Sequence, residues 1–388
     1  MTGSINLLGA TGSIGKQTMD VCRKYPQIRI NTLAAKSDYI GLASAAKEFS
    51  AKKVSIYDKD RYIALKEALS GTDIKVLCGE EGLCECAADE DAECTVNAVV
   101  GASGLTPTIA AIRAHRRIAL ANKETLVAGG SLVMTLARDN GVDIIPIDSE
   151  HSAVFQCLQG ISGDVRSQVK SLILTASGGP FFGKTLAELK DVTPADALRH
   201  PNWTMGSKIT IDSATMMNKG FELIEACHLF DMTPDKVDIT VHRQSIIHSA
   251  IVTADNAVIA QMGVPDMTVP IQYALTFPER YPSSAAPLSL RQIGSLTFEQ
   301  ADESTFSCLK AARRAADIPQ TTAGAVINGA NEVLVHLFLE GKIGFTDIQD
   351  GVNEALNNIS LMHSFSLENI LKADKAAREF AYERSGVR

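Results

Sequence analysis

The sequence lacks an excess of basic residues: 37 lysines and arginines stand against 45 aspartates and glutamates, a net charge of -8. A nucleic-acid-binding protein needs a basic stripe to neutralise phosphates, so the composition argues against nucleic acid as a partner. No apolar run reaches the roughly 18 residues that a membrane-spanning helix requires, so we expect no membrane partner. The chain also begins without a basic or arginine-rich leader, and we expect a cytoplasmic protein.

Paired Cys-x-x-Cys knuckles are absent as well. Four of the eight cysteines lie between Cys78 and Cys94, but no histidine lies among them. Free thiols are therefore favoured over a zinc site, and such cysteine usage fits a reducing compartment. The chain has 388 residues, too many for one small core, so two or three domains are expected.

Residues 1–148 alternate short apolar runs with amphipathic segments. This alternation predicts an α/β domain with a Rossmann-like parallel sheet flanked by helices. The predicted strands are 5–8, 30–34, 53–57, 74–77, 95–99, 118–121 and 142–147, and the predicted helices include 13–23, 107–114 and 124–140.

The remainder predicts two further domains. Residues 149–276 mix strands and helices and predict a central α+β catalytic domain. Residues 277–303 contain many prolines and serines and predict a linker, and residues 304–388 predict a C-terminal helical bundle. The strands expected in the central domain are 171–175, 237–240, 249–252 and 258–262.

The first predicted strand runs into Gly-Ala-Thr-Gly-Ser-Ile-Gly at residues 9–15. Glycines three apart permit a tight turn, and a pyrophosphate can then lie on the N-terminus of the following helix. After the second strand, Lys36 and Ser37 stand where an NAD site places an acid, and no acid occurs before Asp38. This favours NADPH; the alternative is that Lys36 is only a solvated loop lysine.

Two segments carry acidic residues that suit a metal ion. In an extended segment, Asp148 and Glu150 point to the same face. On a helix, Asn218, Glu222 and Glu225 line one stripe, and two acids three apart repel unless a cation lies nearby. Oxygen-only ligands favour magnesium or manganese over zinc. The alternative is a solvated helix face beside a strand-end carboxylate.

Small polar residues suggest an anion site beside these acids. Ser177 precedes two glycines, where hydroxyl and backbone N–H groups can hold an anion. Ser213, Asn218 and Lys219 stand at the start of the carboxylate-bearing helix, whose dipole favours an anion. The alternative is that each serine is a turn or cap residue.

Two further segments predict ligand contacts. Asn122, Lys123 and Glu124 follow a strand end of the first domain, where open α/β sheets bind ligands. The only tryptophan, Trp203, lies among Pro, Asn and Gly in residues 200–206. This composition predicts a lid over a ligand, whereas a lone tryptophan otherwise belongs to a core.

The motifs GATGSIG, LANKETL, PIDSEHSA, TASGGPF, HPNWTMGSKITIDSATMMNKGFELIEA and GVPDMTVPIQYAL occur in this order between residues 8 and 275. Together they resemble the 1-deoxy-D-xylulose 5-phosphate reductoisomerases, and residues 328–332 also fit. The resemblance implies conversion of that sugar phosphate, with NADPH, to 2-C-methyl-D-erythritol 4-phosphate in non-mevalonate isoprenoid biosynthesis. It also implies a homodimer and a divalent ion, Mn²⁺ or Mg²⁺, with Co²⁺ as a further candidate.

The resemblance also implies residue roles. Ala35 and Ser37 stand where the family often has Gly and Asn, which makes the adenine-ribose end the weakest part of this transfer. Glu225 resembles an acid behind the metal ligands, and Met267 would line the site. The metal ligands would be Asp148, Glu150 and Glu222, with Lys123 and His151 also catalytic; the substrate contacts would be Lys123, Ser149, Glu150, Ser177, His200, Trp203, Ser213, Asn218, Lys219 and Glu222; the NADPH contacts would be Thr11, Gly12, Ser13, Ile14, Ala35, Lys36, Ser37, Asn122, Glu124 and Gly206.

The family mechanism breaks and rejoins the carbon skeleton by retro-aldol cleavage and aldol recombination, with the metal acting as a Lewis acid and NADPH supplying the hydride. Two rivals remain. A semialdehyde dehydrogenase also begins with a GATG-type turn, but it needs a nucleophilic cysteine, and Cys157 and Cys227 lie in apolar helical contexts. A non-enzymatic NADP-sensing module would have no use for three convergent carboxylates.

Overall fold

The structure is a computed structural model that describes residues 2–199, 206–362 and 366–386. These residues form two compact units, which are described separately. The first unit contains residues up to 125, 133–152 and 266–286, and the second contains residues 126–132, 153–265 and 287 onward.

The first unit is built on a seven-stranded sheet in the order β4-β3-β2-β1-β5-β6-β7, in which every pairing is parallel. The predicted Rossmann-like sheet is therefore confirmed. The order changes direction between β1 and β5, the point at which open α/β sheets bind ligands. The strands are β1 (Ser4–Leu8), β2 (Arg29–Ala35), β3 (Lys53–Ile56), β4 (Lys75–Cys78), β5 (Cys94–Asn97), β6 (Arg117–Leu120) and β7 (Ile144–Pro146).

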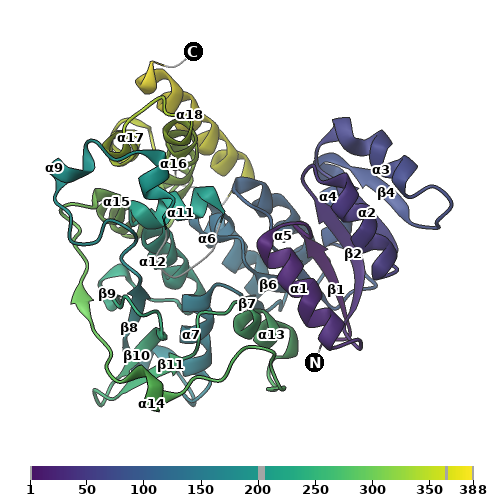
Figure 1. Cartoon of the computed structure of the whole chain (residues 1–388), viewed down its shortest axis with the longest axis horizontal. Coiled ribbons are helices and arrows are strands. Elements are labelled where there is room, and N and C mark those ends of the chain that lie inside the picture. The colour runs from purple at the N-terminus through teal and green to yellow at the C-terminus, as the bar shows by residue number, and fades with distance from the viewer. Residues whose placement is uncertain (1, 200–205, 363–365, 387–388) are drawn as a thin grey trace. The chain divides into compact units, whose positions relative to one another are not determined.

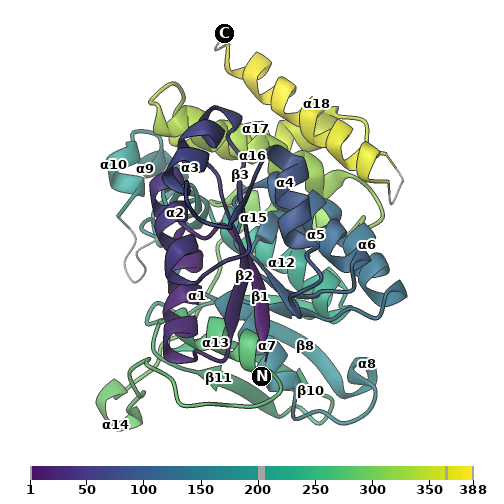
Figure 2. The ribbon, with the colours of Figure 1, turned by 90° about the vertical axis from the view of Figure 1, so that its right-hand side faces the viewer.

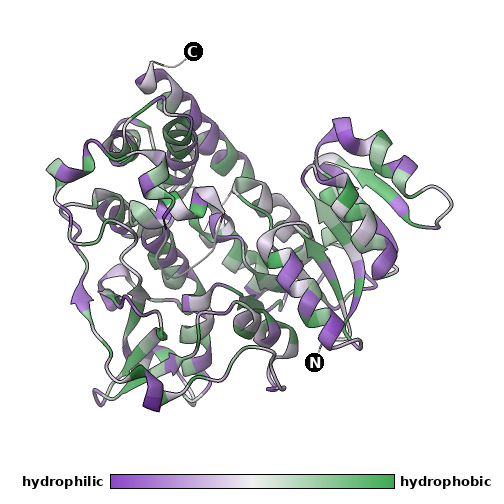
Figure 3. Ribbon diagram, in the orientation of Figure 1, coloured by the Kyte–Doolittle hydropathy of each residue, from purple (hydrophilic) through white to green (hydrophobic). Residues whose placement is uncertain are grey.

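Helices cover both faces of this sheet. Figure 2 shows α1 and α2 on one side of β1 and β2, with α4 and α5 on the other. Every residue of β1 is buried, as a parallel strand covered on both faces requires, and Figure 3 shows green, hydrophobic residues along these strands. The helices are α1 (Ser13–Lys24), α2 (Tyr39–Glu48), α3 (Tyr62–Ala68), α4 (Gly79–Ala87), α5 (Leu105–Arg113) and α13 (Thr268–Thr276). Helices α6 (Lys123–Asp139) and α7 (Ser149–Leu158) contain residues of both units.

The second unit contains a five-stranded sheet in the order β11-β10-β8-β9-β12. Strand β10 runs antiparallel to β8 and β11, whereas β8 and β9 are parallel. This mixed sheet confirms the α+β prediction. Its strands are β8 (Val169–Ala176), β9 (Val237–Val241), β10 (Ile247–Thr253), β11 (Val258–Met262) and β12 (Glu299–Gln300).

The C-terminal part is helical, as predicted, and Figure 1 shows α15 to α18 gathered together. Helix α16 is its centre: its contacts with α17 and α18 bury most of its length. Among the described residues, no helix combines the length and apolar content needed to cross a bilayer. The remaining helices of this unit are α8 (Val165–Gln168), α9 (Leu186–Leu189), α10 (Pro194–Ala197), α11 (Ser207–Ala214), α12 (Met217–Phe230), α14 (Leu290–Ile293), α15 (Ser307–Ala316), α16 (Ala323–Leu339), α17 (Phe345–Asn358) and α18 (Leu367–Ser385).

Candidate active site

The glycine turn after β1 brings backbone groups unusually close together. Gly9 has φ of +82°, and its N–H and that of Ala10 both donate to the Ala34 carbonyl, at 2.9 and 2.8 Å. A Cβ on Gly15 would lie 2.6 Å from the Ala10 carbonyl oxygen. The glycines therefore let α1 begin directly against the end of β1, beside the end of β2.

The N-terminus of α1 suits a phosphate group. Its N-cap residue, Gly12, supplies no side-chain hydrogen bond, and no acid stands in the first turn. Gly12 and Ser13 are exposed, and Thr11 and Ile14 are half-buried. The backbone N–H groups of this turn therefore meet the requirements of a pyrophosphate, and the chain's residues fit a dinucleotide here.

The end of β2 has no acid free to bind a ribose 2′-hydroxyl. Ala35 is buried, whereas Lys36 and Ser37 are exposed. The next acid, Asp38, caps α2 by accepting a hydrogen bond from the Gly41 N–H at 2.9 Å. Since the Asp38 carboxylate holds its own helix, the two exposed residues before it offer a cation and a hydroxyl, which fits a 2′-phosphate.

Asn122 links the loops that follow β5 and β6. Its amide nitrogen donates to the carbonyls of Val99 (2.9 Å) and Gly101 (3.0 Å), and to the Glu124 carboxylate at 2.8 Å. Its amide oxygen caps α6 through the Thr125 N–H at 3.0 Å. Asn122 is 2% exposed, so this side chain shapes the cofactor-side loops from within.

The prediction that Asp148 and Glu150 point to one face of an extended segment is wrong. Strand β7 ends at Pro146 and α7 begins at Ser149, so these acids do not share the face of a strand. Asp148 instead caps α7: its Oδ1 accepts from the N–H groups of Glu150 (3.1 Å) and His151 (3.3 Å). Glu150 then stands in the first turn of the helix.

Three polar side chains surround these two acids. Lys123 Nζ forms an ion pair with Asp148 Oδ2. His151, which is fully buried, places Nδ1 3.4 Å from Asp148 Oδ1. The Ser149 hydroxyl donates to Glu150 Oε2 at 2.7 Å. The first unit thus brings together Lys123, Ser149 and His151 around Asp148 and Glu150.

In the second unit, α12 presents the third predicted metal ligand. Asn218 Nδ2 donates to Glu222 Oε1 at 2.6 Å, and Lys219 Nζ forms an ion pair with Glu222 Oε2. Glu222 is fully buried, and Lys219 and Glu225 are 5% and 3% exposed. A solvated helix face is therefore excluded, because a carboxylate is buried only where cations or donors offset the lost hydration.

The glycine loop after β8 lies against the end of α11. The Gly179 N–H donates to the Ser177 hydroxyl at 3.3 Å, and a Cβ on Gly179 would lie 2.6 Å from the Ser213 carbonyl oxygen. Gly178 and Gly179 both have positive φ. Ser177 and Ser213 are therefore held on neighbouring backbone segments, and Asn218 and Lys219 begin the next helix.

Other predicted residues are placed singly. Gly206 is the exposed N-cap of α11, and Met267 is the N-cap of α13. His200 and Trp203 lie outside the described residues. Sequence reasoning gave no role to Asp212, a buried acid of α11 whose partners are discussed below.

The two cysteines weighed as nucleophiles of the dehydrogenase rival are poorly suited to that role. All eight cysteines of the chain are free. Burial raises the pKa of Cys157 to about 11 and that of Cys227 to about 12. Near neutral pH both thiols are therefore protonated, which disfavours nucleophilic attack by either.

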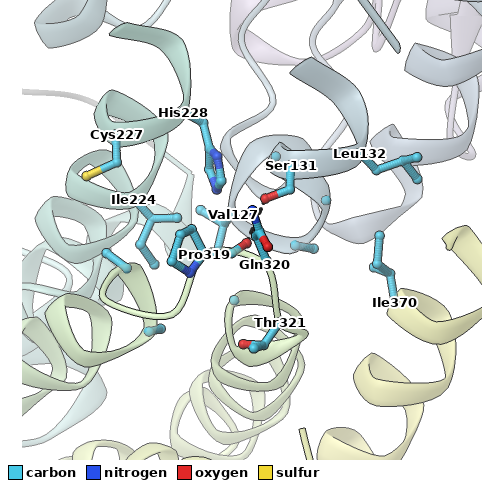
Figure 4. A pocket seen from close by; sticks show the side chains of 16 residues that line it. Val127, Ser131, Leu132, Ile224, Cys227, His228, Pro319, Gln320, Thr321 and Ile370 are labelled. Carbon is cyan, nitrogen blue, oxygen red and sulfur yellow. Dashed lines mark hydrogen bonds between the residues drawn. The ribbon is translucent and has the colours of Figure 1, made fainter. Parts of the chain in front are cut away.

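A cavity in the second unit lies on another side of α12. Figure 4 shows its wall, formed by Val127 and Ser131 of α6, Ile224 and His228 of α12, and the 319–321 loop. The Ser131 hydroxyl donates to the Pro319 carbonyl at 2.6 Å. Helix α6 is kinked here, with non-helical angles at Gly129. The cavity is lined by residues of this kink, and its lining does not include Asn218, Lys219 or Glu222.

The parallel sheet with its uncapped glycine turn, and the buried carboxylate with its cation, fit a nucleotide-dependent oxidoreductase. Three family models match the chain: 1-deoxy-D-xylulose 5-phosphate reductoisomerase over residues 5–130, its C-terminal domain over 144–230, and the DXP reductoisomerase C-terminal domain over 262–380. The chain therefore belongs to the 1-deoxy-D-xylulose 5-phosphate reductoisomerase family.

A curated relative and two solved structures match this chain over nearly its whole length. The chain is 49% identical to the 1-deoxy-D-xylulose 5-phosphate reductoisomerase of Bacillus cereus (strain Q1), covering 98% of this chain and 99% of that protein. The Zymomonas mobilis enzyme in complex with NADPH superposes with a TM-score of 0.92 at 41% identity, covering 99% of each chain. A DOX-P reductoisomerase in complex with NADPH, fosmidomycin and magnesium gives a TM-score of 0.93 at 43% identity, covering 99% and 98%.

The chain is thus an NADPH-dependent oxidoreductase. It converts 1-deoxy-D-xylulose 5-phosphate to 2-C-methyl-D-erythritol 4-phosphate with NADPH and a divalent metal ion.

Proposed function

We propose that Asp148, Glu150 and Glu222 together hold the divalent ion of this reaction. The observation that carries the proposal is the chemistry of the donors, because three carboxylates without nitrogen or sulfur suit a hard cation such as Mg²⁺. When bound, the ion would polarise the substrate's oxygens. The test is NADPH oxidation with 1-deoxy-D-xylulose 5-phosphate while Mg²⁺ is titrated into the metal-free wild type and into Glu150→Gln. An unchanged half-saturating Mg²⁺ concentration in the variant would refute the assignment.

Lys123 and His151 would orient the metal-binding carboxylate. Both lie against Asp148, one as an ion-pair partner and one with its ring nitrogen 3.4 Å away. A carboxylate fixed from two sides keeps its remaining lone pairs directed at a ligand. The Lys123 ammonium, only 8% exposed, would also contact a substrate oxygen and stabilise negative charge that develops there.

The substrate's phosphate would be held by Ser177, Ser213, Asn218 and Lys219. Support comes from the contact between the 177–179 loop and α11, and from the N-terminus of α12, which has neither a side-chain cap nor an acid in its first turn. These hydroxyl, amide and ammonium donors match phosphate oxygens. Lys219 would serve two anions, because its ammonium group has three donors.

NADPH would lie across the glycine turn. The pyrophosphate would meet the N-terminus of α1 at Thr11 to Ile14, and the 2′-phosphate would meet Lys36 and Ser37. The support is the exposure of those two residues together with the engagement of Asp38 as a helix cap. Asn122 and Glu124 would hold the loop on which the nicotinamide end rests.

The loop that contains His200 and Trp203 would close over the substrate and exclude water. The chain has no other tryptophan, so its fluorescence reports on this loop alone. Emission should shift when Mg²⁺ and substrate are added together. A signal unchanged at saturating ligand would return Trp203 to a structural role.

We also propose a homodimer, formed at the edge of the second sheet. Strand β11 is one of the two edge strands, and its Val258 and Ile259 are 60% and 39% exposed. An apolar edge of this kind is normally covered, because it otherwise pairs indiscriminately. Sedimentation should give twice the chain mass, and Val258→Lys should shift it toward the monomer. A monomeric wild type would refute the proposal.

The oxygen-only donor set would also accept Mn²⁺ and Co²⁺, which titration of the metal-free enzyme would reveal as restored activity. Eight free cysteines suit the reducing cytoplasm, and fractionation of cells that express the protein would test that location.

A further inference from the structure

A buried carboxylate next to the phosphate residues has two partners from different parts of the second unit. Asp212 of α11 is 2% exposed. Its Oδ2 pairs with Lys208 Nζ at 2.8 Å, and its Oδ1 accepts from Asn331 Nδ2, also at 2.8 Å. Lys208 is on the same helix, whereas Asn331 is on α16, at the centre of the C-terminal helices.

The burial of Asn331 is unfavourable for the free energy of folding. It is fully buried, and its Oδ1 has no hydrogen-bond partner among the described residues. An unpaired buried amide oxygen is unfavourable, and an apolar side chain of similar volume would avoid that cost. The contribution of Asn331 therefore lies in its single well-formed hydrogen bond, which satisfies the buried Asp212 carboxylate.

The backbone carbonyl of Asp212 belongs to the turn between α11 and α12. The Thr215 hydroxyl donates to the Asp212 carbonyl at 3.2 Å and accepts from the Met217 N–H at 3.3 Å. Met216, between the helices, adopts left-handed angles with φ of +62°, which fixes a sharp change of direction. Asn218 begins α12 directly after this turn.

The end of α11 that carries Asp212 also contacts the glycine loop 177–179. Ser213 follows Asp212 directly, and its carbonyl packs against Gly179. A shift of α11 along its axis would therefore move the Ser213 hydroxyl and the 177–179 loop together, away from the start of α12. The Asp212 carboxylate is the polar anchor that ties this end of α11 to α16.

We propose that Asn331 is a positioning residue for substrate binding: through Asp212 it sets the spacing between Ser213 and the N-terminus of α12, and so the fit to the substrate's phosphate. The proposal rests on the proposed phosphate site. Asn331 touches neither Ser213 nor Lys219 in the hydrogen bonds described, so its effect is on affinity for the phosphorylated substrate and not on the chemical step.

The chain offers a matched control on the same helix. Asn328 is also fully buried, and its Oδ1 also has no partner among the described residues, but its Nδ2 faces Glu332 of α16 at 3.5 Å. Asn331→Leu and Asn328→Leu therefore make the same chemical change one helical turn apart. Only the first removes a hydrogen bond to α11.

The experiment uses the full-length enzyme with Mg²⁺ and NADPH. Asn331→Leu should raise KM for 1-deoxy-D-xylulose 5-phosphate about tenfold, the effect of losing one such interaction. The inhibition constant of inorganic phosphate should rise by a similar factor. The kcat and the KM for NADPH should stay near the wild-type values, and Asn328→Leu should change none of the four.

Rescue separates position from packing. Asp212→Asn combined with Asn331→Asp restores an amide–carboxylate hydrogen bond between α11 and α16 in the reversed sense. It should recover most of the substrate affinity that Asn331→Asp alone loses, because that single variant sets two buried carboxylates against each other. If Asn331→Leu fails to fold, Asn331→Ala, which removes the same donor without adding bulk, replaces it, with the same rise in substrate KM expected.

Failure of the inference and failure of the phosphate site give different results. If Ser213→Ala raises KM for the sugar phosphate while Asn331→Leu and Asn331→Ala leave it unchanged, the phosphate site stands and the role of Asn331 is refuted. If Ser213→Ala also leaves KM and phosphate inhibition unchanged, the phosphate site itself is misassigned. A fall in melting temperature equal in Asn331→Leu and Asn328→Leu, with unchanged KM, would likewise reduce Asn331 to a packing residue.

Discussion

Replacing Glu222 by glutamine removes one negative charge from a fully buried site and changes little else in size. In the structure this carboxylate accepts from Asn218 at 2.6 Å and pairs with Lys219, which is itself 5% exposed. The variant therefore leaves a buried ammonium group facing a neutral amide. It also removes one of the three proposed oxygen ligands of the ion.

The two consequences have separate magnitudes. Removing one partner of a buried ion pair costs about 3–5 kcal/mol of unfolding free energy. The lower end applies here, because Glu222→Gln keeps an oxygen that still accepts from Lys219. Separately, an ion present at a hundred times its Kd stabilises the native wild type by about 2.7 kcal/mol. In Glu222→Gln this increment should largely disappear.

Urea unfolding at fixed pH, without and with Mg²⁺, measures both terms. Turnover of 1-deoxy-D-xylulose 5-phosphate should fall by orders of magnitude, while NADPH binding, whose proposed phosphate contacts lie in the first unit, should not change. Glu225→Gln is the matched control, since Glu225 is equally buried and one turn further along α12. It should lose less of the Mg²⁺ increment. A Glu222→Gln protein that keeps the full increment would refute Glu222 as a ligand.

Lys36→Ala should narrow the preference for NADPH over NADH by about ten- to a hundredfold, because a charge-assisted contact is worth about 1.5–3 kcal/mol; an unchanged ratio of kcat/KM values would make Lys36 a solvated loop residue. Ser213→Ala should weaken binding of the sugar phosphate and leave the KM for NADPH alone. Gly130→Ala should destabilise the protein, because a Cβ there would lie against the His228 ring, and adding His228→Ala should restore stability in thermal unfolding. Burial lowers the pKa of His228 from 6.5 to about 4, so on acidification the unfolded chain takes up the proton before the folded protein does. His228 therefore costs no stability above pH 6.5, and below it the unfolding free energy falls by up to about 1.4 kcal/mol per pH unit down to pH 4. His228→Phe should remove that slope.

Most of the fold follows from local pattern. The period of the apolar residues located the parallel strands and the helices within a few residues, since a buried parallel strand is a continuous apolar run. The exception is the segment after residue 142. An apolar run followed by Asp-Ser-Glu reads equally well as a longer strand, and the deciding interaction is the capping of α7 by the Asp148 carboxylate. Such a cap depends on one side-chain rotamer, which periodicity does not report.

The role of an acid near a cofactor also depends on geometry. Asp38 stands three residues after β2 ends, close to where an NAD site places the acid that binds the ribose 2′-hydroxyl. Its hydrogen bond to the Gly41 N–H shows that the helix uses it instead. The pair Asp212 and Asn331 lies beyond any local pattern, because 119 positions separate the two residues.

Helix N-termini show how little a single feature decides. The starts of α1 and α12 have no side-chain cap and no acid in the first turn, but the same is true of α5 and α15. What distinguishes the first two is the backbone that leads into them: the Gly9 turn before α1, and the left-handed Met216 before α12. Each of these two helices also has a lysine that we assign to its ligand, Lys36 after β2 for α1 and Lys219 in the first turn of α12. Anion binding therefore requires dipole, turn and cation together, and α1 and α12, which combine all three, are the helices to which we assign the two phosphate-bearing ligands of the reaction.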